Sequence, residues 1–126
     1  MEARYLNVDL VIQSDSDLTE LTLFLEGKAF FLWKELNVNQ SSIGVETNLH
    51  DTTEPEQDIV ELLNIIESMP PKIQQLWLNC KKRLMDIGFE CGTITNPINA
   101  SISIETVKRL AKADCAINVR IYGGSE

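Results

Sequence analysis

The sequence has few residues suited to covalent or metal chemistry. It contains three cysteines and a single histidine, His50. Cys80, Cys91 and Cys115 are odd in number and show no C-x-x-C spacing, which argues against a disulfide framework and a zinc site. We therefore expect a cytoplasmic protein whose three thiols stay reduced and fill the core.

Long apolar runs and glycine-rich loops are also missing. No segment reaches the roughly 18 apolar residues of a membrane-spanning helix, and no basic region followed by an apolar run marks a signal peptide. The glycines of LEGK and YGGSE lack the spacing of a loop that cradles phosphate. We expect no membrane contact, no cofactor and no bound metal.

Positive charge is scarce. The 126 residues include 11 Lys and Arg against 19 Asp and Glu, a net charge of −8. An acidic surface repels nucleic acid and anionic membranes, so neither is expected as a direct partner, whereas a basic protein would be attracted. From Glu35 to Pro71 there is no Lys or Arg at all, and eight acids fall there.

The length and composition fit a single domain over residues 1–126. Alternating apolar and polar positions predict strands at 5–13, within 29–38, and at 43–49, 89–95 and 115–122. Apolar spacings of three and four residues predict helices at 17–27, 53–68, 72–87 and 104–112. This order predicts an α+β fold: a two-layer sandwich of one mainly antiparallel sheet, about five strands wide, covered on one face by three or four helices.

The stretch LHDTTEPEQDIVELL contains the histidine and admits two interpretations. His50, Asp51 and Glu54 could form a metal or acid–base cluster, but such a site needs several converging ligands. A helix start explains more residues, because Thr53 and Glu56 match a capping box and Pro55 suits the first turn. The second interpretation is favoured, and no catalytic residue is assigned.

The acids of the same stretch have two possible roles. Glu54, Asp58 and Glu61 are expected on the outer face of the helix, opposite its apolar stripe. Such a face is most often solubilising, but it could also dock a basic protein. The docking candidates are Glu46, His50, Asp51, Glu54, Glu56, Asp58 and Glu61.

Cys80 lies beside a basic run, Lys81 to Arg83, which could activate a thiol. However, helical spacing places Cys80 on the apolar face of the predicted 72–87 helix, with Trp77 and Leu84. The basic run is then the solvated face of that helix, and Cys80 is a core residue.

Several segments resemble a bacterial family known as domain of unknown function 4279. The end of the chain, ISIETVKRLAKADCAINVRIYGG, is similar to the closing helix and strand of that family. LTELTLFL, the segment around Trp33, and DIVELLNIIESMPPKIQQLW also resemble it. One departure is SSIGVETN, where the family often has a tryptophan.

The resemblance implies a small cytoplasmic bacterial domain without established catalytic residues. Similar acidic proteins accompany polymorphic toxins as immunity proteins, including those of contact-dependent growth inhibition. The expected function is therefore to neutralise a cognate toxin by stoichiometric binding, and the expected toxin is a basic nuclease domain. The alternative is a non-catalytic module that binds a small ligand or a housekeeping protein. The oligomeric state is left open.

Overall fold

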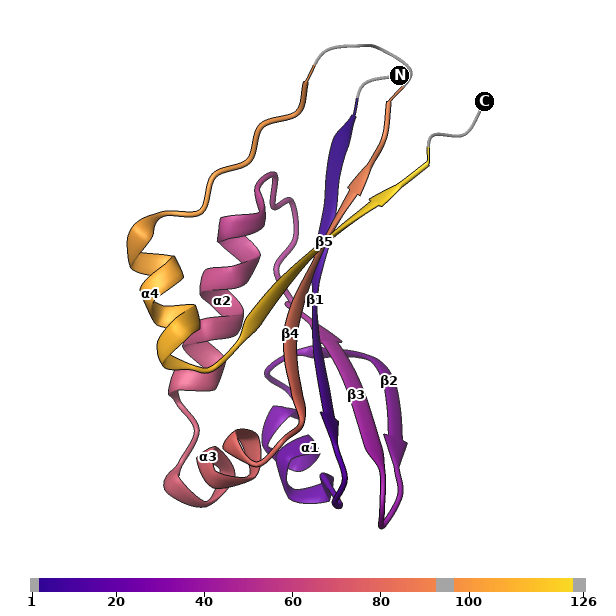
Figure 1. Cartoon of the computed structure of the whole chain (residues 1–126), viewed down its shortest axis with the longest axis vertical. Coiled ribbons are helices and arrows are strands. Elements are labelled where there is room, and N and C mark those ends of the chain that lie inside the picture. Colours follow the sequence, from indigo (N-terminus) through magenta and orange to yellow (C-terminus); the bar gives the residue numbers. More distant parts are fainter. Residues whose placement is uncertain (1–2, 93–96, 124–126) are drawn as a thin grey trace.

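A computed structural model of the chain (Figure 1) describes residues 3–92 and 97–123. The strands are β1 (Arg4–Ser14), β2 (Phe30–Leu36), β3 (Ser41–Glu46), β4 (Lys82–Glu90) and β5 (Ala116–Tyr122). The helices are α1 (Thr19–Leu25), α2 (Pro55–Glu67), α3 (Pro71–Leu78) and α4 (Ile104–Lys112). The predicted order of strands and helices is confirmed.

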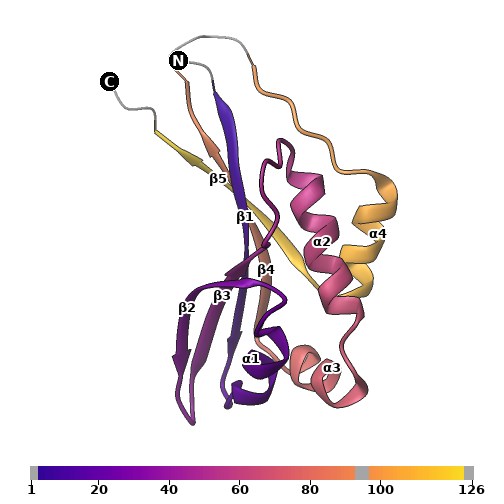
Figure 2. The same ribbon diagram turned by 180° about the vertical axis from the view of Figure 1, so that it is seen from behind.

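The five strands form one open sheet in the order β2-β3-β1-β4-β5. All neighbouring strands are antiparallel except β4 and β5, which are parallel and joined by a crossover through α4. The helices pack against one face of the sheet, and the other face is open (Figures 1 and 2). The predicted α+β fold is therefore confirmed.

The core lies between the central strand β1 and the helices. Val8, Leu10 and Ile12 are buried on the covered face, as their alternation predicts. Leu6 was expected to join them, but a register shift against β4 between Tyr5 and Asn7 leaves Leu6 38% exposed. The shift instead turns Tyr5 toward the core, where it packs at the edge of the cluster.

The predicted helix over 72–87 was wrong beyond Leu78. α3 ends there, and β4 begins only a few residues later, so the strand expected at 89–95 starts earlier and ends at Glu90. Positions 93–95 of that expected strand lie outside the described residues. Met85 and Ile87 are buried by alternation, and β4 pairs with β1 along nearly its whole length. Pairing between distant strands therefore decides the structure of this segment.

Arg83 is not the solvated helix residue that the sequence suggested. Its Nη1 donates hydrogen bonds to the carbonyls of Trp77 (3.1 Å), in the last turn of α3, and Cys80 (2.6 Å), just after that helix. Its Nε donates to the carbonyl of Asp114 (2.8 Å) in the turn between α4 and β5. One side chain thus joins two connections that are far apart in the sequence.

The helix starts follow the predicted chemistry in part. Ser103 caps α4 by accepting from the backbone N–H of Thr106 at 3.3 Å. Asp17 accepts from the N–H of Thr19 at 3.1 Å, but Glu20 pairs with Lys72 instead of completing a capping box. No helix in the described ranges has the length and apolar character that crossing a bilayer requires.

Candidate functional site

The candidate site is built around the connection between β3 and α2. Glu54 is the N-cap of α2, and Pro55 is the first residue of the helix. The side-chain oxygen of Gln57 accepts hydrogen bonds from the backbone N–H groups of Thr53 (2.8 Å) and Glu54 (3.0 Å). The helix start is therefore capped, but its box is one residue later than the predicted pair of Thr53 and Glu56.

Asp58 does not lie on the outer face of α2, so its predicted exposure was wrong. It is 5% exposed and turned toward the sheet. Its carboxylate accepts hydrogen bonds from the hydroxyls of Thr47 (2.8 Å) and Thr52 (2.9 Å) and from the phenol of Tyr5. These three donors satisfy the buried carboxylate oxygens. Asp58 therefore stabilises the fold from the interior.

Tyr5 of β1 is the donor to Asp58 that comes from the central strand. Burial, and then the adjacent Asp58 carboxylate, raise the pKa of the Tyr5 phenol above its ordinary value. The phenol therefore stays protonated and acts as the donor. Sequence reasoning missed Tyr5, because the strand irregularity that turns it inward leaves no local signal.

Glu56 is also tied into the fold. Its carboxylate accepts a hydrogen bond from the backbone N–H of Ser103, the residue that caps α4. This bond lowers the pKa of Glu56. Glu56 therefore connects the starts of α2 and α4.

Four of the seven predicted docking residues surround one polar hollow of about 270 Å³. They are Glu46, His50, Asp51 and Asp58. His50 and Asp51 are exposed, and Asp51 has a left-handed backbone (φ 62°) at the turn. Glu54 and Glu61 do not line this hollow.

The hollow offers negative charge and hydrogen-bond acceptors. Within residues 3–92 and 97–123, no three His, Cys, Asp or Glu side chains are grouped so as to hold a metal ion. The ion pairs of the described residues lie outside this hollow. The six ion pairs found among the described residues use Asp15, Glu20, Glu26, Glu67, Asp86 and Glu90. Glu46, Asp51, Glu54 and Glu61 take part in none of them, so their charge is uncompensated.

A second acidic cluster lies on the open face of the sheet. Asp9 of β1 stands directly opposite Asp86 of β4, which pairs with Arg120 at 3.1 Å. Burial, followed by the charges of Glu46 and Asp86, raises the pKa of Asp9 to about 6. The sequence indicated only that Asp9 points away from the core, because which strands pair, and in which register, cannot be derived from one sequence.

The cysteines divide between core and surface. Cys80 and Cys115 are buried, as predicted, and burial raises their pKa values to about 11 and about 12. Their thiols are therefore neutral near pH 7. Cys91 is exposed, so its predicted inward position was wrong: β4 ends at Glu90, and the inward alternation ends with it.

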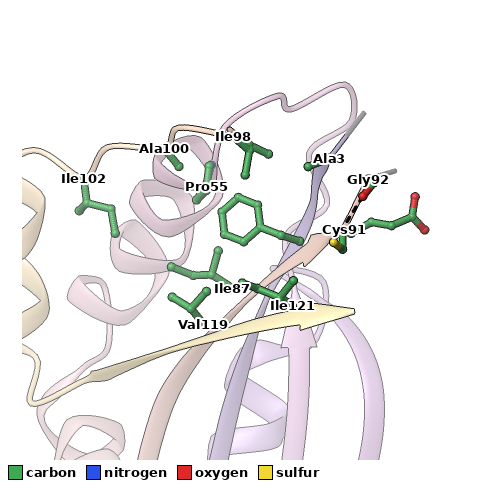
Figure 3. Close-up of a pocket in the computed structure, with 12 residues that line it drawn as sticks. Ala3, Pro55, Ile87, Cys91, Gly92, Ile98, Ala100, Ile102, Val119 and Ile121 are labelled. Atoms are coloured by element: carbon green, nitrogen blue, oxygen red, sulfur yellow. Dashed lines mark hydrogen bonds between the residues drawn. The ribbon is translucent and has the colours of Figure 1, made fainter. Parts of the chain in front are cut away.

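Cys91 lies beside an apolar cavity of about 450 Å³ at the end of the sheet. Figure 3 shows Ile87, Val119 and Ile121 on the sheet side, facing Ile98 and Ala100 from the segment that leads to α4. The volume is within the range of small-molecule sites.

No protein-family model, curated protein or solved structure compared with the chain matches it. The strands and helices themselves therefore define the class, an α+β domain with a five-stranded sheet. The resemblance to the 4279 family stays a prediction.

Proposed function

We propose that the chain is a cytoplasmic immunity protein, which neutralises a basic toxin domain by stoichiometric binding and performs no catalysis. The supporting observation is the uncompensated charge at the connection between β3 and α2. Asp51 and Glu54 are exposed there, and no ion pair among the described residues includes Glu46, Asp51, Glu54 or Glu61.

Uncompensated surface charge favours association with a protein of opposite sign. Paired carboxylates have part of their field cancelled by a neighbouring cation, whereas unpaired carboxylates attract a basic surface over about a Debye length, roughly 8–10 Å at ordinary salt. This attraction speeds the encounter and disfavours acidic partners. A nuclease, whose cleft must be basic to hold nucleic acid, fits this requirement.

The contacts of two acids support a smaller docking set than the sequence suggests. Asp58 and Glu56 make hydrogen bonds that stabilise the fold, so we leave them out of the proposed docking set. The proposed docking surface comprises Glu46, His50, Asp51, Glu54 and Glu61. Its backbone is fixed by the capped start of α2, which would hold the acids in place before binding and reduce the entropy lost in the complex.

The test is a protection assay against the toxin domain encoded beside the gene. Cells producing that domain should survive with the wild-type chain and die with the triple variant D51N/E54Q/E61Q. The matched control is D15N/E20Q/E26Q, which removes the same charge from acids already held in exposed ion pairs. Equal survival with both variants would contradict the docking surface. A genomic neighbourhood without a toxin gene would contradict the function itself.

The apolar cavity supports a second candidate, a module that binds a small apolar ligand. Its walls come from the sheet and from the segment before α4, with Pro55 beside them. A dye that fluoresces in apolar surroundings, such as anilinonaphthalene sulfonate, should then bind to the wild-type chain, and A100F should block its binding. A111F, an equally large change at an exposed position on α4, should leave dye binding intact.

A further inference from the structure

The two edges of the sheet differ in how they are protected from other strands. Bulges and charged side chains prevent an edge strand from pairing with another chain. β2 has both, because its register shifts between Phe31 and Trp33 and it includes Lys34 and Glu35. β5 pairs with β4 over all its residues without a register shift. It contains a single charged residue, Arg120, which forms an ion pair with Asp86.

β5 also carries an apolar row that the helices leave exposed. Ile117, Val119 and Ile121 lie beside buried or half-buried residues of β4, so they point to the helix-covered side of the sheet. Exposure nevertheless rises along the row, from 39% at Ile117 through 54% at Val119 to 67% at Ile121. Figures 1 and 2 show why: the upper end of β5 extends past α2 and α4.

We propose that β5 pairs antiparallel with β5 of a second copy of this chain, joining two sheets into one across a two-fold axis at Val119. In that register Val119 faces its own counterpart, and Ile117 of each copy faces Ile121 of the other. The apolar row is therefore self-complementary, as a two-fold interface requires. The hydrogen-bonding groups on the outer edge of β5 gain partners at the same time.

The charge pattern of β5 favours this register. It also favours a second copy of the chain as the source of the partner strand. With the axis at Val119, Arg120 stands opposite Asn118, whereas an axis at Arg120 would set two like charges directly opposite each other. The chain has a net charge of −8, yet β5 contains no acid, so two copies can meet here without placing carboxylates face to face. Ile104 and Val107 of α4, both exposed, add apolar surface on the covered side.

This inference is independent of the proposed function. The acids of the docking surface belong to the segment from β3 to α2, and the dimer surface belongs to β5. Each can fail without the other, because the variants that test them share no residue.

Sedimentation equilibrium tests the proposal. The wild-type chain should show a monomer–dimer equilibrium between about 1 µM and about 1 mM. V119K places two like charges at the axis and should weaken the dimer about tenfold or more. The matched control is V38K at an 82% exposed valine in the connection between β2 and β3, which should dimerise like the wild type. A wild-type chain that is monomeric throughout, or a dimer unaffected by V119K, would overturn the proposal.

A cross-linking variant tests the register without a new charge. In a C91S background, V119C should form a covalent dimer on mild oxidation, because opposite residues of antiparallel strands lie about 4.5–5.5 Å apart, within disulfide reach. A116C, near the start of the same strand, should not cross-link, since the two-fold axis places its counterpart far away. The register would be contradicted if V119C and A116C cross-linked equally, or if neither variant cross-linked.

Discussion

The phenol of Tyr5 in β1 donates a hydrogen bond to the buried carboxylate of Asp58 in α2, which fastens the main helix to the central strand. Thr47 and Thr52 donate to the same carboxylate from the connection between β3 and α2, which includes part of the proposed docking surface. The polar contact therefore fixes both the helix and the loop before it. The carboxylate of Asp58 is buried and stabilises the fold, whereas Asp51 and Glu54, which we propose for recognition, are exposed.

Replacing Asp58 should be strongly destabilising. D58A would leave the hydroxyls of Tyr5, Thr47 and Thr52 without their shared acceptor, and the expected loss is about 2–4 kcal/mol in the free energy of unfolding. Urea unfolding followed by circular dichroism measures it. E35Q, a neutralisation at an exposed position of β2, is the control and should change stability by less than about 0.5 kcal/mol. Equal stability of the two variants would contradict the role given to Asp58.

A side chain at Gly44 should collide with Trp33. The Trp33 ring covers Gly44 on the open face of the sheet, and its Nε1 donates to Ser42 at 3.0 Å. A methyl group at Gly44 would lie closer to the ring than atoms can approach, so G44A should cost about 1–3 kcal/mol. In a W33V background the same substitution should cost less than about 1 kcal/mol. Additive costs in the double variant would show that the ring is not the cause.

Asp9 should make the folded state less stable as the pH rises. Its pKa is about 6 in the folded chain and near the ordinary 3.8 when unfolded. Between these values the folded state binds more protons, so stability is lost as pH rises from about 4 to about 6. D9N should therefore stabilise the chain at about pH 8 by about 1 kcal/mol, allowing for solvent screening of a half-exposed group, and have little effect at about pH 4. Urea unfolding at both pH values measures the difference, and a D9N effect that is the same at both would contradict the assignment.

Arg83 should be sensitive even to a conservative change. R83K keeps the charge but cannot donate to the carbonyls of Trp77, Cys80 and Asp114 together. The expected loss is about 2 kcal/mol, read from thermal unfolding. K82Q, at the exposed neighbouring position, should lie within about 0.5 kcal/mol of the wild type. If R83K unfolds at the same temperature as the wild type, these hydrogen bonds do not stabilise the fold.

The pattern of side chains predicted the fold class because most elements have one clear period. β1 and α2 are examples, since apolar alternation marks the first and three- and four-residue spacing marks the second. The segment after Leu78 fits both periods. Ile87 belongs to the helical series that starts at Ile73 and to the alternating series of Met85 and Phe89. Only pairing with β1 selects the strand, and that information is not local.

The acidic region was predictable as a segment but not residue by residue. Helical spacing placed Asp58 on the outer face together with Glu54 and Glu61, yet the structure turns it to the sheet. The decisive groups are hydroxyls from β1 and from the turn before α2, which make burial of the carboxylate favourable. Asp9 and Asp86 were missed for the same reason, since their closeness depends on strand register.

The rate of association with the toxin domain, measured by stopped flow at increasing salt, tests the central claim most directly. The wild-type chain and the control D15N/E20Q/E26Q should bind quickly at low salt and lose that advantage as salt screens the charges. D51N/E54Q/E61Q should bind about tenfold or more slowly at low salt and depend little on it. Identical rates and salt dependence for the two triple variants would contradict recognition through the acidic surface between β3 and α2.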